Sequence, residues 1–412
     1  MSGINYSPIG RPFIISAVLL SFFGVSIGSL WMFSLLGIRI AEVSDLFQIH
    51  KTVQTEGFLT LMIMGVSYMI IPRFRNTALP SNKLAALSFV LVLASLILEL
   101  VQKVSRSESL AYSELIRLGG IMIFASMSIY TIRIAPKLLR EADYFFIMAI
   151  IMLSLVHILP LVTAVEINTL NYIQVWLIFP TLMIFGVKYK TLPSFLGFIR
   201  PRRNLTVACL AAGAVGCALG ITSMYYDDAG ILVAFNAVMI LTALLFAASS
   251  YIYGGFDNSE ILKMMPGEKK ARYDMILRHT RIAFLFLIAG FTMGIMFYLY
   301  NGFLFYDLAI HYTAIGFIGI TIMLFLPLML PPIIGKSIEF LKFSRVPLLL
   351  IVGALGLRTA GNYIIEKSVH SDLTVVFATS GLLVLAGMLW FIVMIHKSMS
   401  EIPSVNVEFK KK

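Results

Sequence analysis

The chain has 412 residues, of which 59% are hydrophobic and 13% are charged, and its mean hydropathy is +0.91. A soluble globular chain carries about a quarter of charged residues, so this composition excludes an ordinary cytosolic enzyme. Two cysteines and no heptad repeat also exclude a disulfide scaffold and a coiled coil. The apolar residues form blocks of about 20, the length that crosses ~30 Å of hydrocarbon, which indicates an integral membrane protein.

Taken in chain order, the apolar blocks predict twelve membrane-spanning helices and therefore an all-α, polytopic membrane protein. The spans are expected near residues 12–36, 47–71, 84–100, 118–132, 144–165, 172–187, 205–224, 231–253, 282–300, 308–329, 346–365 and 374–395. They leave a single transmembrane domain over residues 1–412 and one larger charged loop, residues 254–280. No cleavable signal peptide is expected, because the first apolar block is too long for one.

Lysine and arginine are unevenly distributed between alternate loops. With the N-terminus inside, 25 of the 32 fall on the termini and the even-numbered loops. The other seven are Arg39, Lys51, Lys103, Arg106, Arg117, Arg358 and Lys367. Positive residues accumulate on the cytoplasmic side, so both termini are expected in the cytoplasm and the protein in the cell (plasma) membrane. The net charge of +11 is therefore an orientation signal, and its spread over short loops argues against a nucleic-acid partner.

Three of the six histidines are expected at the membrane surface. His279 and His396 fall at cytoplasmic helix ends, and His370 falls in an outer loop. An interfacial position needs no special role, so these three carry no functional hypothesis.

The other three histidines share one depth near the outer face. His50 begins span 2, His311 lies about one turn into span 10, and His157 lies about two turns before the outer end of span 5. Ionisable side chains inside a span are costly and are functional by default. Their common depth favours ligation of a cofactor. For each one alone, a structural histidine bonded to a backbone carbonyl is the alternative.

Small residues accompany the histidines of spans 2 and 10. Gly57 and Gly65 follow His50 by 7 and 15 residues, which keeps them on its helix face, and Gly316 follows His311. Such positions would let a broad flat ring approach the helix. Close helix packing is the other interpretation.

Two charged residues within spans need partners. Arg358 lies about a dozen residues into span 11, and its planar guanidinium suits carboxylates, including the propionates of a haem. The structural alternative is an ion pair with Glu99. Pro160 follows His157 by three residues and is expected to free a backbone carbonyl that the histidine could bond. His157 as a ligand of copper or of a second haem is the competing hypothesis.

Three segments resemble the NnrS family of twelve-span membrane proteins, which bind haem and copper and are linked to nitric oxide and nitrosative stress. They read "RPFIISAVLL", "QIHKTVQTEGFLTLMIMGVSYMIIPRF" and "FYDLAIHYTAIGFIGITIMLFLPLML". The family's His-Ala-His-Glu-Met reads "HKTVQ" here, which keeps His50 and replaces the second His and the Glu by Thr52 and Val53. The resemblance therefore implies one haem, whereas a copper ligand set is incomplete.

Span 2 also resembles subunit I of haem-copper oxidases and nitric oxide reductases. In that superfamily, histidines of spans 2 and 10 hold a low-spin haem, which implies that His50 and His311 are axial ligands of a b-type haem here. The His-x-x-x-Tyr of span 6 and the His-His pair of span 7 are absent. If the protein is a membrane oxidoreductase subunit, it lacks the usual oxygen-reducing binuclear centre.

Three functions compete. The first is a haem protein that passes electrons between a quinone and an external redox protein, or that responds to nitric oxide. The second is a twelve-span secondary transporter, although no tandem half-repeat is evident. The third is a structural subunit associated with other membrane subunits of a respiratory complex. Beyond the lipid bilayer, the sequence does not choose among these partners.

Overall fold

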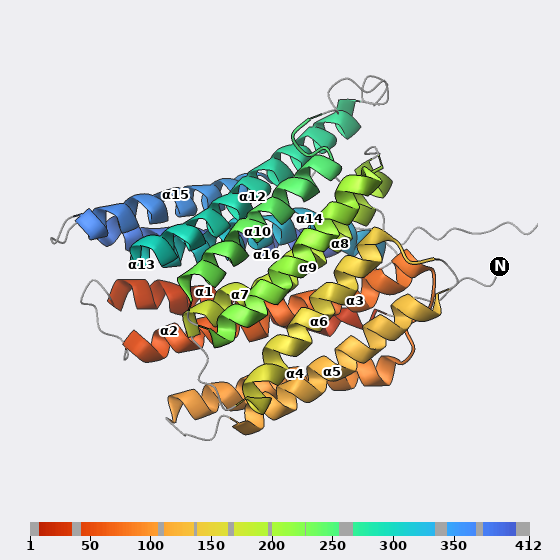
Figure 1. The fold of residues 1–412 in the computed structure, drawn as a ribbon, viewed down its shortest axis with the longest axis horizontal. Helices are drawn as coiled ribbons and strands as arrows, with labels where there is room; N and C mark the ends of the chain where they lie inside the picture. The colour runs from red at the N-terminus through yellow and green to blue at the C-terminus, as the bar shows by residue number, and fades with distance from the viewer. Residues whose placement is uncertain are drawn as a thin grey trace, which may run out of the picture.

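A computed structural model shows long helices that run side by side along a common direction (Figure 1). It describes residues 8–34, 43–105, 111–135, 138–163, 169–196, 200–226, 228–254, 267–333, 344–367 and 374–400. The elements are α1 (Gly10–Ser34), α2 (Val43–Thr52), the π-helix η1 (Val53–Leu59), α3 (Thr60–Arg75), α4 (Asn82–Val104), α5 (Ala111–Ile134), α6 (Glu141–Val162), α7 (Thr169–Trp176), α8 (Ile178–Leu196), α9 (Arg203–Tyr225), α10 (Ala229–Ser249), α12 (Gly267–Tyr300), α13 (Phe303–His311), the π-helix η2 (Tyr312–Gly319), α14 (Ile320–Ile333), α15 (Val346–Lys367) and α16 (Thr374–Ser400). Within these ranges the chain forms no strand.

In the described parts of the chain, twelve helices are long and apolar enough to cross a membrane, which confirms the predicted number of potential spans and the all-α class. The predicted charged loop over residues 254–280 is partly wrong, because α12 already begins at Gly267. Its first turns are polar, with Glu268, Lys269 and Lys270, and hydropathy alone could not distinguish a polar helix extension from a loop.

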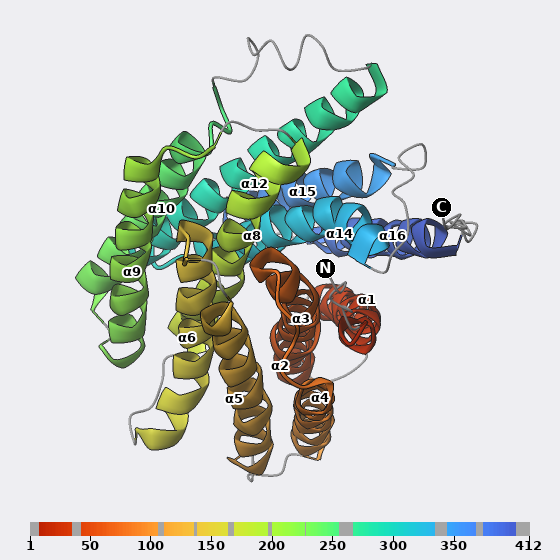
Figure 2. The same ribbon diagram turned by 90° about the vertical axis from the view of Figure 1, so that its right-hand side faces the viewer.

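Three of the spans are built from more than one element. Asp45–Arg75 combines α2, η1 and α3; Asn171–Pro193 combines α7 and α8, with a break at Leu177; Phe303–Leu326 combines α13, η2 and α14. They are also the most buried spans, with 78%, 89% and 61% of their apolar windows inside the protein. The end-on view shows α3 and α8 surrounded by other helices (Figure 2). Irregular backbone is tolerated in a membrane only where protein covers it, so the interrupted helices occupy the centre.

The peripheral helices pack as consecutive pairs, α4 with α5, α9 with α10 and α15 with α16. Local sequence sets their ends. The side chain of Ser81 accepts a hydrogen bond from the Leu84 amide at 3.2 Å and caps α4, and Asp228 caps α10 through the Ile231 amide at 3.0 Å. Asn76, with φ of 53°, ends α3 in the left-handed conformation that Asn tolerates.

Candidate functional site

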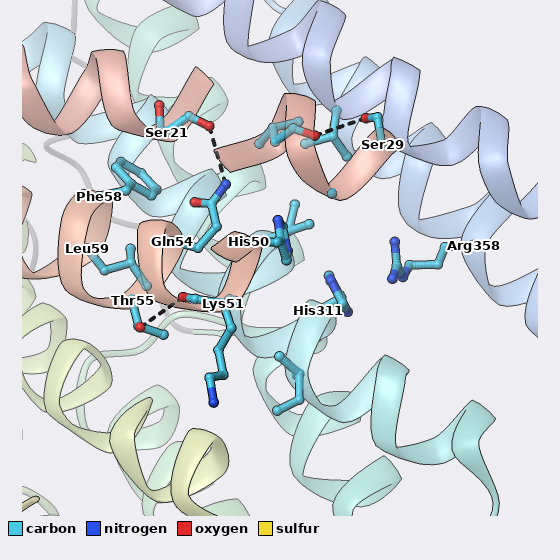
Figure 3. Close-up of a pocket in the computed structure, with 18 of the residues that line it drawn as sticks. Ser21, Ser29, His50, Lys51, Gln54, Thr55, Phe58, Leu59, His311 and Arg358 are labelled. Atoms are coloured by element: carbon cyan, nitrogen blue, oxygen red, sulfur yellow. Dashed lines mark hydrogen bonds between the residues drawn. The ribbon is translucent and has the colours of Figure 1, made fainter. Parts of the chain in front are cut away.

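A largely apolar cavity lies between the interrupted helices and the α1, α15 and α16 helices (Figure 3). The space among its lining side chains, counted together with the part that is open to solvent, is about 1350 Å³. Its acidic, basic and histidine lining residues are His50, Lys51, Asp307, His311 and Arg358. The structure thus brings together two of the three predicted ligand histidines and Arg358, from three distant parts of the chain.

His50 reaches the cavity from α2, and its ring is held by α1. Its Nδ1 donates a hydrogen bond to the carbonyl oxygen of Gly24 at 2.7 Å. The ring lies against Gly28, where an added Cβ would approach Nδ1 and Cε1 to 2.6 Å. Because a carbonyl only accepts, Nδ1 carries the proton and Nε2 keeps its lone pair. Among the described residues Nε2 has no hydrogen-bond partner.

His311 is held in the same way at the end of α13. Its Nδ1 donates to the carbonyl oxygen of Asp307 at 2.8 Å and lies 3.2 Å from the carboxylate Oδ1 of the same residue. In the neutral ring the lone pair then lies on Nε2, and no described residue bonds this atom. Histidines that ligate metals typically donate their second ring nitrogen to a carbonyl or a carboxylate, which fixes the tautomer and the ring orientation. Both cavity histidines have this arrangement.

A π-helix follows each of the two histidines. The π-helix η1 starts three residues after His50, and η2 starts directly after His311. A π-helix inserts an extra residue into the helical turn and is frequent at functional sites. The two cavity histidines therefore share their backbone setting as well as their hydrogen bonding.

Arg358 does not have the partner that the sequence suggested. The Arg358–Glu99 pair is wrong, because the guanidinium forms a bidentate pair with Asp307, Nε to Oδ2 at 2.6 Å and Nη2 to Oδ1 at 2.5 Å. Asn362 donates to the same carboxylate at 2.7 Å. Only Nη1 points elsewhere, to the sulfur of Met32 at 3.4 Å. Arg358 thus orients the carboxylate that touches His311, and it has one nitrogen left for another acceptor.

Asp307 belongs to the candidate site but was not predicted from the sequence. It lies four residues before His311, on the same face of α13, and its side chain is 3% exposed. An acidic residue one helical turn before a histidine in an apolar span was the available signal.

The predicted glycines do not line the cavity. Gly57 faces Leu20 and Leu96, Gly65 faces Phe13, and Gly316 faces Phe286. They allow close helix packing, which corrects the expectation that they make room for a ring. The glycines at the cavity are Gly28, Gly319 and Gly381.

His157 lies outside this cavity, in a buried polar cluster on the other side of η1. Its Nδ1 donates to the carbonyl of Leu153 at 2.9 Å, and its Nε2 lies 3.1 Å from Oε2 of Glu56. Leu153 is the carbonyl one turn back, and not one that Pro160 frees. A metal role would require the ring to leave Glu56, so the geometry favours the structural alternative for His157.

Glu99 belongs to this second cluster too. It pairs with Arg117 and with Lys103, whose Nζ lies 2.7 Å from Oε1. Over the described residues, no three His, Cys, Asp or Glu side chains converge as they would around a metal ion.

No protein-family profile matches the chain, and no curated protein matches it.

Proposed function

We propose that the chain is a membrane protein that holds one b-type haem between His50 and His311 and that takes part in electron transfer or in a response to nitric oxide. The observation that carries the proposal is the pair of cavity histidines, each with Nδ1 bonded to a protein oxygen and Nε2 available. The segments similar to the NnrS family and to the second span of haem-copper oxidases point to the same two residues.

The residues around the two histidines suit a broad apolar ring. The cavity wall includes the aromatic and aliphatic side chains of Phe47, Phe58, Ile310, Ile322 and Phe391. Two imidazole ligands make a haem iron six-coordinate and low-spin, which supplies one-electron chemistry. His50 and His311 would hold the iron, Asp307 would orient His311, and Nη1 of Arg358 would be available to a propionate.

The orientation is part of the proposal. The distribution of positive charge supports a plasma-membrane location with both termini cytoplasmic. His50 and His311 then lie near the outer face, within reach of a quinol in the bilayer and of an external redox protein. No copper site is proposed, because both nitrogens of His157 already face oxygen atoms.

A secondary transporter is the second candidate, and the interrupted central helices favour it. Discontinuous helices form the substrate sites of many transporters, and here three central spans are interrupted. The wall of this cavity is mostly apolar, however, and two of its charged side chains, Asp307 and Arg358, are paired with each other.

Purification of the protein in mild detergent separates these candidates. The proposal predicts one haem per chain by extraction of the pigment, and a Soret band that shifts when dithionite is added. A colourless protein from haem-sufficient cells would contradict the proposal and leave the transporter or a structural subunit. Metal analysis of the same sample tests for copper.

A further inference from the structure

A second group of ionisable side chains is buried one helix layer away from the cavity, between η1, α4, α5 and α6. Glu56, Glu99, Arg117 and His157 are each at most 8% exposed. Arg117 binds Glu99 and lies 3.9 Å from Oε2 of Glu56, which in turn contacts His157. Charged groups are rarely buried in a membrane protein unless they are paired and serve a function.

The hydrogen bonds of His157 fix how many protons this group holds. Its Nδ1 faces the carbonyl of Leu153, which only accepts, and its Nε2 faces the carboxyl group of Glu56 at 3.1 Å. If neither Nε2 of His157 nor the carboxyl group of Glu56 carried a proton, the lone pair of Nε2 would face a carboxylate with no hydrogen between the two atoms. The contact therefore holds one proton, either on the imidazole or on the carboxyl group. His50 and His311 differ, because their Nε2 atoms face the cavity.

Several other titratable groups lie near the Glu56–His157 pair. The titratable groups that face it are Lys51 on α2, Glu99 and Lys103 on α4, Glu114 and Arg117 on α5, and Tyr172 on α7. Arg117 and Lys103 both contact Glu99. The Glu56–His157 pair is the contact in this cluster between a carboxyl group and an imidazole.

The pair is connected both to the cavity and to the surface. Lys51 and Thr55 line the cavity (Figure 3). Glu56 follows Thr55 within η1. On the other side, Glu99 leads to Lys103, whose side chain is 17% exposed and which also donates to Thr52 at 2.5 Å. The cluster of polar side chains thus extends from beside the cavity to Lys103 near the end of α4.

We propose that Glu56 and His157 form a proton-binding site. It takes up one proton when the haem proposed for the cavity gains one electron, and it releases that proton when the haem is re-oxidised. This inference rests on the proposed function. In the oxidised state the pair holds one proton. A quinol, giving one electron at a time, or another one-electron donor supplies the electron, and water at the outer face supplies the proton to the pair. On re-oxidation an external one-electron acceptor takes the electron and the proton returns to water at the outer face. The uptake of a positive charge close to the added electron lowers the electrostatic cost of burying that electron in a low-dielectric interior.

The test is the dependence of the haem midpoint potential on pH, measured by redox titration of the purified protein. Full coupling of one proton to one electron gives a fall of ~59 mV per pH unit. The wild type is expected to show a slope close to this value over the range in which the pair titrates. Glu56→Gln and His157→Gln are both expected to flatten the slope and keep the haem. In the first variant His157 stays neutral, and in the second Glu56 stays ionised beside Arg117.

His279→Gln is the matched control, because His279 is a buried histidine whose Nδ1 donates to the carbonyl one turn back, Met275, at 2.7 Å in α12. It should keep the wild-type slope. A flat slope in the wild type, or an unchanged slope in either variant of the pair, would overturn the inference.

A second measurement does not depend on the haem. Infrared difference spectra between low and high pH should show a carboxyl band in the wild type that Glu56→Gln removes and His279→Gln keeps. An identical spectrum in Glu56→Gln would overturn the proton site. A chain that purifies without haem would contradict the proposed function, and the infrared titration would then decide the proton site alone.

Discussion

At the scale of single residues, the site depends on the atoms that hold the two imidazoles. The Gly24 carbonyl and the Asp307 carbonyl each accept from an Nδ1, which makes the opposite nitrogen of each ring the available ligand. The same residue type behaves differently at His157, where Nε2 is already bonded to Glu56. Sequence position alone could not distinguish His50 and His311 from His157. The hydrogen-bond partners of these imidazoles lie on other helices or one turn earlier on the same helix.

Gly28→Ala tests how His50 is positioned. A Cβ at this position would come within 2.6 Å of the imidazole, so the ring must move while the helices stay in place. We expect haem affinity to fall about 10- to 100-fold, as for other changes next to a metal ligand, with little loss of folded protein. Haem occupancy and size-exclusion profiles measure the two effects. Gly353→Ala, whose nearest neighbour would be 3.9 Å away, should retain full occupancy. Equal occupancy in both variants would contradict the assignment of His50.

Asp307→Asn tests the support of His311. The change leaves the buried Arg358 without a charged partner, and such a loss costs about 3–5 kcal/mol. We therefore expect a lower unfolding temperature in detergent and loss of haem. The double variant Asp307→Asn, Arg358→Met removes both charges and should recover most of the stability, because buried pairs contribute little net free energy. A single variant as stable as the wild type would show that the pair is not structurally important.

At the scale of elements, the spans could be predicted and their interruptions could not. Hydropathy locates twelve apolar blocks because each must cross the same thickness of lipid. The π-helices after His50 and His311 depend on packing in the protein interior, which a window average does not detect. The same limit explains the glycines. Regular helical spacing placed Gly57 and Gly65 on the face of His50. The π-helix η1, which contains Gly57 and separates Gly65 from His50, turns the two glycines towards other helices.

Deletion of Gln54 tests the role of η1. Removal of one residue should convert the π-helix into an α-helix and turn the preceding segment by about 100°, which is one residue of helical rotation. His50 would then leave the cavity while the helix content measured by circular dichroism stays the same. We expect loss of haem. Deletion of Ala78, an exposed residue between α3 and α4, is the control that should keep it. Retention of haem without Gln54 would show that η1 does not position His50.

At the scale of the whole molecule, the proposed function requires one orientation of the protein in the membrane. The described residues form twelve potential membrane-spanning helices, and the distribution of Lys and Arg indicates which side is expected to face the cytoplasm. With both termini inside, the ends of α1 and α15 that lie next to the cavity face outwards. His50 and His311 lie at the same depth below the outer membrane surface only if spans 2 and 10 both enter the membrane from the outside.

Reporter fusions test that orientation. A reporter after residue 412 or within residues 255–266 should be active in the cytoplasm, and one between residues 227 and 228 should be active outside. Residues 255–266 are chosen because the rest of the predicted loop belongs to α12. An outside signal from residues 255–266 would overturn the span assignment and place the cavity on the other side.

The central claim is that His50 and His311 are the two axial ligands of one haem. Electron paramagnetic resonance of the oxidised protein, together with the reduced-minus-oxidised absorption spectrum, tests it most directly. The wild type should give a low-spin signal, since both ligands are imidazole nitrogens. His50→Ala and His311→Ala should each convert that signal to high-spin or abolish it, while His279→Gln keeps it. If both single variants retain the wild-type low-spin signal and difference spectrum, the pairing is contradicted.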